Sequence, residues 1–296
     1  MPTYNHEKFV SIAIEGVLNQ KTSFNFELLI HDDASTDHTQ HIIKQYAAKF
    51  PNIIKPIYQV QNQHSLGIPN SLILFPLAKC KYIAICEGDD YWTDPYKLQK
   101  QVDFLEQNAD YNLCFHKVSI LDGEEIKEDW ITCPPRKSFT TIYDLLEFAN
   151  YIHTPSVVFR NNIGELPIWY QACPIGDYAL YLLVVKNGKI KYFEETMAVY
   201  RYGVGMFSSS RYDQQSWNWN YTLFLISKFF DEELRPTVKM KLMGSQKYIA
   251  QLNVHYGVPQ LSIKELSGLI SIKKTFQLLL YSLQKKFLKG VGKKNE

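Results

Sequence analysis

Short apolar segments alternate with amphipathic stretches along the first 120 residues. Short apolar runs are typical of buried strands, and apolar residues spaced three and four apart are typical of helices. The expected strands are 26–30, 53–60 and 82–86, and the expected helices are 6–20, 37–50, 66–79 and 95–107. This alternation predicts an α/β fold in which a mostly parallel sheet is flanked by helices.

The second half of the chain is less regular. Strands are expected at 156–159 and 190–200 with a helix at 177–186 between them, and the pattern from residue 212 onward is mostly helical. No internal repeat and no linker rich in Gly and Ser divides the sequence. We therefore do not expect two independently folding domains.

The overall composition excludes several classes of protein. A formal net charge of +2 is too small for a protein that coats nucleic acid. The five cysteines form no CxxC pair, which argues against a zinc site or a disulfide framework and for a reducing compartment. No apolar run approaches the ~20 residues of a membrane span, and the first residues lack signal-peptide character. We expect a cytoplasmic protein with no nucleic-acid partner.

The tail at 270–296 holds seven lysines and a single acidic residue, so the rest of the chain is net negative. Six of its apolar residues fall on one helical face: Ile272, Phe276, Leu279, Leu280, Leu283 and Phe287. A basic amphipathic helix of this kind can lie on anionic lipid, here at the inner face of the cell membrane. The alternative is a helix packed on the body of the protein, with its lysines in water.

Acidic clusters follow two of the expected strands. One is Asp-Asp-Ala-Ser-Thr-Asp at 32–37, and the other is Glu-Gly-Asp-Asp at 87–90. Ligands of such sheets bind beyond the carboxyl ends of the strands, so the two clusters predict one site. The leading aspartates of the first cluster can accept hydrogen bonds from a nucleobase or ribose. The alternative is that Ser35 or Asp37 only caps the next helix.

The second cluster places Glu87, Asp89 and Asp90 within four residues. Carboxylates this close repel one another unless a cation or solvent neutralises them, and divalent cations such as Mg²⁺ prefer oxygen ligands. Gly88 permits a tight turn that aims more than one carboxylate at a single ion. A solvated acidic turn is the alternative, although a position between a buried strand and an aromatic pair suits solvation poorly. We expect a divalent-metal site that shares its ion with substrate phosphates.

Four motifs occur in an ordered set. They are Pro-Thr-Tyr-Asn at 2–5, Glu-Gly-Val-Leu-Asn-Gln at 15–20, Glu-Leu-Leu-Ile-His-Asp-Asp-Ala-Ser-Thr-Asp at 27–37 and Glu-Gly-Asp-Asp-Tyr-Trp at 87–92. In order and spacing the set resembles family-2 glycosyltransferases, and the run at 94–101 is similar to bacterial members that build surface polysaccharides. The resemblance implies a GT-A-type, nucleotide-sugar-binding domain over 1–210 and a helical C-terminal extension over 211–296.

The resemblance also implies which residues bind the donor nucleotide. Tyr4 and Asp33 would hold the uracil of a UDP-sugar, with Pro2 and Asp32 beside them. The acceptor would be a saccharide or a lipid-linked sugar.

By the same resemblance, Asp89 and Asp90 would be the acidic pair that reaches the ribose and a Mn²⁺ or Mg²⁺ ion on the diphosphate, with Glu87 at the first position of that motif. Asp177 aligns with the catalytic base. A bound cation neutralises the leaving group, and one carboxylate deprotonates the attacking hydroxyl, so the anomeric centre inverts. The alternative for Asp177 is an ordinary helix N-cap after Gly176.

Two features depart from the family pattern. Related sequences begin with a buried strand just before Pro-Thr-Tyr-Asn, whereas Met1 directly precedes Pro2 here. We therefore expect the first strand to be missing, through a misplaced start or a truncated chain. Related sequences also often carry a His near residues 200–205 that contacts the metal or diphosphate. This chain has none there, and Arg201 is either a substitute phosphate ligand or a surface salt-bridge partner.

The sequence thus predicts an inverting, metal-dependent glycosyltransferase that uses a UDP-sugar in surface-polysaccharide or lipopolysaccharide assembly. One alternative is a truncated, non-catalytic protein that only binds the nucleotide-sugar. The other is a nucleotidyltransferase or a metal-dependent phosphohydrolase that uses the same carboxylates.

Overall fold

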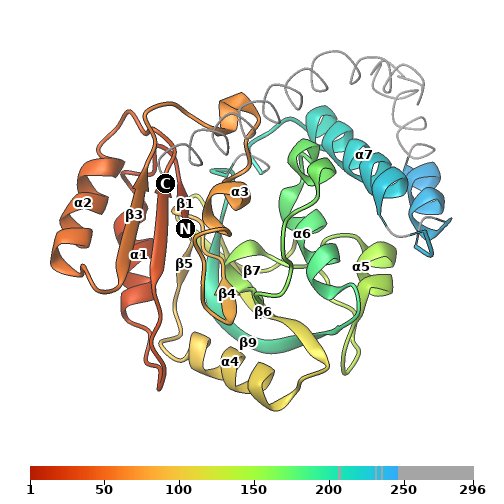
Figure 1. Cartoon of the computed structure of the whole chain (residues 1–296), viewed down its shortest axis with the longest axis horizontal. Coiled ribbons are helices and arrows are strands. Elements are labelled where there is room, and N and C mark those ends of the chain that lie inside the picture. Colours follow the sequence, from red (N-terminus) through yellow and green to blue (C-terminus); the bar gives the residue numbers. More distant parts are fainter. Residues whose placement is uncertain (206–207, 231, 235, 246–296) are drawn as a thin grey trace, which may run out of the picture. The chain divides into compact units, whose positions relative to one another are not determined.

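The computed structural model describes residues 1–205, 208–230, 232–234 and 236–245, and most of these belong to one compact unit, Met1–Leu242. A first sheet contains three parallel strands in the order β1 (Pro2–Thr3), β2 (Leu28–Asp32) and β3 (Ile54–Tyr58). Helices α1 (Val10–Leu18) and α2 (Thr39–Lys49) connect these strands (Figure 1). These elements match the expected ones to within a few residues.

The strand that we expected to be missing is present in short form as β1. The buried Met1 donates its amino group to the Leu29 carbonyl at 2.8 Å, and its own carbonyl accepts the N–H of His31 at 2.9 Å. Thr3 likewise accepts the N–H of Asp33 at 3.0 Å. Because these main-chain bonds need only three residues, a short segment covers the edge of β2 next to the candidate site.

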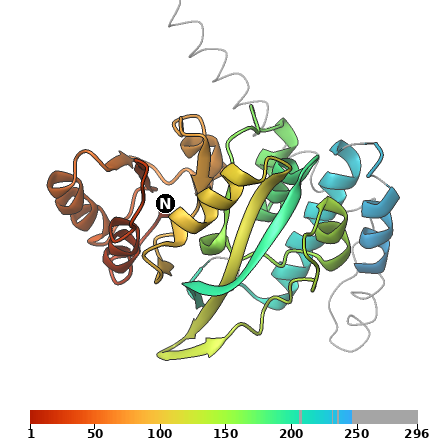
Figure 2. The same ribbon diagram turned by 90° about the horizontal axis from the view of Figure 1, so that it is seen from below.

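The second sheet is mixed, which corrects the expectation of a mostly parallel sheet. Its order is β4 (Tyr82–Ala84), β8 (Val158–Arg160), β6 (Tyr111–Asp122), β9 (Lys189–Tyr202) and β5 (Tyr91–Trp92), with β7 (Glu125–Glu128) paired to β6. Only β6 and β9 run parallel, and the two long strands curve side by side in Figure 2. The alternation within the first 120 residues could not reveal this, because β8 and β9 come from later in the chain.

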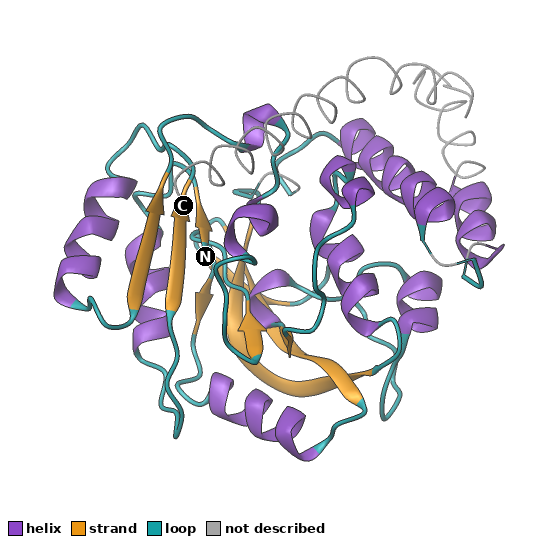
Figure 3. Ribbon diagram, viewed as in Figure 1, coloured by secondary structure: helices purple, strands orange, loops and turns teal. Residues whose placement is uncertain are grey.

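Helices surround the sheets in Figure 3. They are α3 (Asn70–Leu74), α4 (Lys97–Gln107), α5 (Ile142–Phe148), α6 (Gly176–Val185) and α7 (Tyr212–Phe229), with short 3-10 segments at His64–Leu66, Thr154–Ser156 and Ile168–Ala172. The helix expected at 66–79 is much shorter, since Pro69 and Pro76 interrupt it.

Helix α6 lies deep in the structure, since seven of its ten residues are buried. It packs on α7 through the rings of Tyr178 and Trp219, whose centroids are 5.0 Å apart. This burial holds the first turn of α6, which carries Asp177, in a fixed place.

No helix within the described residues is both long and apolar enough to cross a membrane. The basic amphipathic helix expected at 270–296 lies outside the described residues, so that expectation and the boundary at residue 210 remain predictions.

Candidate active site

The turn between β4 and β5 gathers three carboxylates. Glu87, Asp89 and Asp90 each offer an oxygen atom, and these atoms all lie within 4.8 Å of one another. Asp89 and Asp90 are buried, at 5% and 1% exposure. This is the oxygen-rich, charge-dense arrangement that a divalent cation prefers.

Asp90 has an oxygen that the protein itself does not satisfy. Its Oδ1 accepts the main-chain N–H of Arg201 at 2.8 Å. Its Oδ2 is buried and has no hydrogen-bond partner among the described residues. Burial, followed by the charges of Asp89 and Glu87, raises the pKa of Asp90 well above its ordinary value. A bound cation would remove both the repulsion and the unsatisfied oxygen, so the residues present fit a metal.

Burial and neighbouring carboxylates affect the pKa of Glu87 in the same direction as that of Asp90. Burial, the charge of Asp89 and then the charge of Asp177 raise the pKa of Glu87 to about 8. The effect of Asp177 shows that the structure brings this residue of the second half close to the acidic turn. The sequence predicted the two parts of the site separately, and the fold joins them.

Gly88 is required by close packing rather than by an unusual turn. Its N–H donates to the Pro2 carbonyl at 3.0 Å. A Cβ atom built on Gly88 would lie 2.5 Å from Cγ2 of Thr3 and 2.8 Å from Nδ1 of His6. Strand β1 and the loop after it therefore press directly on the acidic turn, and only glycine leaves room for them.

Arg201 lies in β9 and contacts the acidic turn. Its Nε donates to the Asp89 carbonyl at 2.9 Å, and its guanidinium lies over the ring of Phe9, 4.3 Å from the centroid. It forms no ion pair within the described part of the chain. Within the described residues, Arg201 therefore makes main-chain and aromatic contacts and not the surface salt bridge that was the alternative.

Asp177 lies in the first turn of α6 and is not its N-cap, because Ile175 occupies that position. Its Oδ2 accepts a 2.8 Å hydrogen bond from Nδ2 of Asn150. Burial raises the pKa of Asp177 above its ordinary value. A positioned carboxylate with a raised pKa suits a general base.

The first two aspartates of the first acidic cluster accept hydrogen bonds from neighbouring segments. Asp33 accepts the N–H groups of Gln63 at 2.6 Å and His64 at 3.0 Å, and so fixes the loop after β3. Oδ2 of Asp32 accepts a bond from Gln40, whereas its buried Oδ1 has no partner among the described residues. A carboxylate oxygen can accept two bonds, so both side chains keep capacity for a ligand.

His38 occupies the N-cap position of α2. Oδ1 of Asp37 nevertheless accepts the N–H of Thr39, the first residue of the helix, at 2.9 Å, so Asp37 does cap the helix start as the alternative expected. Oγ of Ser35 accepts the N–H of Asn5, and Oδ2 of Asp37 accepts the N–H of Glu7. Both side chains therefore hold the loop that follows β1. Tyr4, which begins that loop, is 44% exposed and available for stacking on a ligand.

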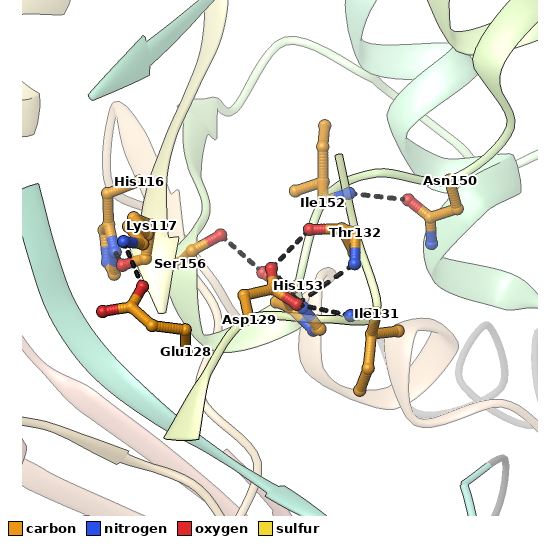
Figure 4. A network of polar contacts seen from close by, with 10 residues as sticks. All are labelled: His116, Lys117, Glu128, Asp129, Ile131, Thr132, Asn150, Ile152, His153 and Ser156. Carbon is orange, nitrogen blue, oxygen red and sulfur yellow. Dashed lines mark hydrogen bonds and ion pairs between the residues drawn. The ribbon is translucent and has the colours of Figure 1, made fainter. Parts of the chain in front are cut away.

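Sequence reasoning missed Asn150 and the contact between His153 and Asp129. Nε2 of His153 lies 3.1 Å from Oδ2 of Asp129, and its ring packs on Tyr200 with a centroid distance of 4.8 Å. Figure 4 shows that Asp129 also holds the turn that contains Thr132. No motif marks these residues, since their contacts join segments that are distant in the sequence.

A cavity of about 660 Å³ lies beside this network. Its walls are residues 131–136 together with Phe148, Asn150 and Tyr151. Asn150 thus borders the cavity and contacts Asp177 at the same time.

Comparison with known sequences places these features in context. The profile described as "Glycosyl transferase family 2" matches residues 1–165. An uncharacterized protein of Mycobacterium tuberculosis is 38% identical over 203 residues, which are 67% of this chain and 56% of that protein. An uncharacterized glycosyltransferase of Nostoc is 33% identical over 67% of this chain and 62% of its own length. This chain therefore spans a little over half the length of these relatives.

A third relative is the putative teichuronic acid biosynthesis glycosyltransferase TuaG of Bacillus subtilis, 25% identical over 74% of this chain and 83% of TuaG. Among solved structures, S. aureus TarS with UDP-GlcNAc aligns with a TM-score of 0.59 and 17% identity, over 94% of this chain and 76% of TarS. The mannosyltransferase PcManGT of Pyrobaculum calidifontis with GDP-Man and Mn²⁺ gives 0.53 and 13%, over 99% and 86%.

Proposed function

This chain belongs to glycosyl transferase family 2, and from that premise we propose that it is an inverting, metal-dependent glycosyltransferase that uses a UDP-sugar donor. The GT-A-type fold expected from the sequence is confirmed by the solved structures that it resembles. The observation that carries the proposal is the group of Glu87, Asp89 and Asp90, in which a buried oxygen of Asp90 has no partner in the described part of the chain.

The donor site that we propose lies at the ends of β1 and β2. Tyr4 is exposed there, and main-chain bonds between β1 and β2 hold Pro2 and Tyr4 next to Asp32 and Asp33. A half-exposed aromatic ring can stack on a base, and carboxylates beside it can accept hydrogen bonds from the N–H groups of that base. TarS, a structural neighbour, has been solved with UDP and with UDP-GlcNAc.

The metal site that we propose consists of Asp89 and Asp90, with Glu87 beside them. Mn²⁺ or Mg²⁺ held there would neutralise charge on the departing diphosphate. PcManGT, a structural neighbour, has been solved with Mn²⁺. Arg201, fixed by its bonds to Asp89 and Asp90, presents the remaining edge of its guanidinium for a phosphate oxygen.

Asp177 is the general base of this proposal. The acceptor oxygen forms a bond to the anomeric carbon while the bond from that carbon to the diphosphate breaks. The acceptor's proton passes to Asp177, and UDP leaves. A raised pKa strengthens the carboxylate as a base, and attack opposite the leaving group inverts the anomeric centre.

The acceptor that we propose is a saccharide or a lipid-linked sugar in cell-surface polysaccharide or lipopolysaccharide assembly. The name of TuaG, which refers to teichuronic acid biosynthesis, supports this class. The lysines of residues 270–296 support a peripheral contact with anionic lipid on the cytoplasmic side of the membrane.

Calorimetric titration of the full chain with UDP, with and without Mn²⁺, tests the donor and metal sites. We expect binding that depends on Mn²⁺ and is lost with EDTA. Binding of equal strength without metal would reject the metal role. Incubation with UDP-sugars then tests the reaction, because a glycosyltransferase releases UDP, a nucleotidyltransferase releases pyrophosphate and a phosphohydrolase releases phosphate. A chain that binds UDP and releases none of these, with saccharide acceptors present as well, would be a non-catalytic binding protein.

A further inference from the structure

The Asn150 side chain is held in one orientation. Its Oδ1 accepts the main-chain N–H of Ile152 at 3.3 Å, as Figure 4 shows. Its Nδ2 therefore faces the other way and donates to Oδ2 of Asp177 at 2.8 Å. The bond to Ile152 excludes the flipped amide, which would set two acceptors against each other at Asp177.

The backbone before Asn150 is strained. Ala149 ends α5 with φ 64° and ψ −160°, a region that is essentially restricted to glycine. Such a conformation costs of order 1–3 kcal/mol and persists only where the surroundings impose it. Helix α5 precedes it directly, and the capping box of Thr141 and Asp144 anchors the start of that helix. The strained turn points the next residue toward α6.

The surroundings of Asp177 make this contact matter for its charge. Burial raises the pKa of Asp177, whereas the hydrogen bonds from the Tyr178 N–H and the Asn150 amide lower it. The charges of Glu87 and Asp177 also interact with each other. The charge of His153 lowers the pKa of Asp177. Asn150 is therefore one of the groups that stabilise the ionised form, and it also borders the cavity of about 660 Å³.

We propose that Asn150 is a positioning residue whose amide holds the Asp177 carboxylate, ionised and in a single orientation, ready to accept the acceptor's proton. This inference rests on the proposed role of Asp177 as the base. Asn150 itself takes no proton and forms no covalent bond.

The test uses the full chain labelled with ¹³C at its aspartate carboxyl carbons. The resonance of Asp177 is assigned as the one that disappears in Asp177→Asn. We expect Asn150→Ala to raise the titration midpoint of Asp177 by about one pH unit, because a neutral donor to the charged form is lost. Asn150→Asp, which is nearly isosteric, should raise it further by adding a like charge. Asn162→Ala, the same change at an exposed site, should leave the midpoint unchanged.

The rate of hydrolysis of UDP-GlcNAc and UDP-glucose, with water as acceptor, gives the second readout. In both Asn150 variants the acidic limb of kcat should move to higher pH, with kcat about tenfold lower or more and the KM for the donor unchanged. An unmoved Asp177 midpoint in the folded variants would overturn the inference. If Asn150→Ala does not fold, Asn150→Asp decides. If the wild type neither binds UDP nor hydrolyses a UDP-sugar, the proposed function is in error, and the carboxyl titration still decides the role of Asn150.

Discussion

The main-chain N–H of Arg201 donates a 2.8 Å hydrogen bond to Oδ1 of Asp90, across 111 residues of sequence. The bond joins β9 to the acidic turn and occupies one of the two carboxylate oxygens. The other oxygen, Oδ2, is buried and without a partner among the described residues. The second half of the chain thus contacts the acidic turn of the first half through Arg201, and Oδ2 of Asp90 stays available for a ligand.

Asp90→Asn should abolish Mn²⁺-dependent binding without lowering the stability of the metal-free protein. The amide preserves the shape of the side chain and the acceptor for the Arg201 N–H, but it removes the buried negative charge. We expect the Mn²⁺-dependent rise in melting temperature and the Mn²⁺-dependent binding of UDP to disappear. In EDTA the variant should melt at or above the temperature of the wild type, because a charge repelled by its neighbours is gone. Differential scanning fluorimetry and calorimetric titration measure both effects.

Asp103→Asn is the matched control, because Asp103 is exposed on α4 and distant from the turn in sequence. It should retain the response to Mn²⁺. An Asp90→Asn protein that still binds UDP in a Mn²⁺-dependent way would show that the cation is held elsewhere.

The metal-free protein should lose stability as pH rises from about 4.5 to about 8. The pKa of Glu87 is raised from 4.5 to about 8 by burial, by Asp89 and by Asp177. The folded state therefore binds this proton more tightly than the unfolded state, so the free energy of unfolding falls across that range. Urea denaturation between pH 5 and 9 in EDTA measures the slope.

Glu87→Gln isolates this contribution, because all other titrating groups are common to the variant and the wild type. The stability difference between the two proteins should grow in favour of the variant as pH rises to about 8, and then level off. A difference that stays constant with pH would mean that Glu87 keeps an ordinary pKa.

Gly88→Ala should destabilise the protein by about 1–3 kcal/mol, the usual range for overpacking. The added methyl group would meet Thr3 and His6 at distances that real Cβ atoms do not show. Displacing β1 should also weaken the binding of UDP. Urea denaturation and calorimetric titration measure the two losses.

Two further variants sharpen this prediction. Gly244→Ala is the control, since a Cβ there meets nothing within 4 Å. Thr3→Ser combined with Gly88→Ala removes the closest clashing methyl group and should recover part of the stability. No recovery would place the strain at His6 instead of β1.

The acidic turn, strands β2 and β3 of the first sheet and helix α6 could be predicted from the sequence because each is a local pattern. Residues 28–32 form a buried strand that ends in two aspartates, and residues 87–90 concentrate charge in a turn. The place of β8 between β4 and β6, the capture of Arg201 by Asp90 and the contact of Asn150 with Asp177 have no such pattern. Each joins segments that the sequence separates.

By itself, then, the sequence determined which segments bury an apolar face and which carboxylates lie at their ends, since periodicity and residue type act within a few neighbouring residues. Only the tertiary structure decided that β1 pairs with β2, that no side chain fits at Gly88 and that the charge of Asp177 acts on Glu87. The physical reason is that the apolar face of a helix or strand must pack against another element, but its local sequence does not specify which element that is. Packing between distant segments chooses the partner, and that choice sets the charge and burial of every group in the site.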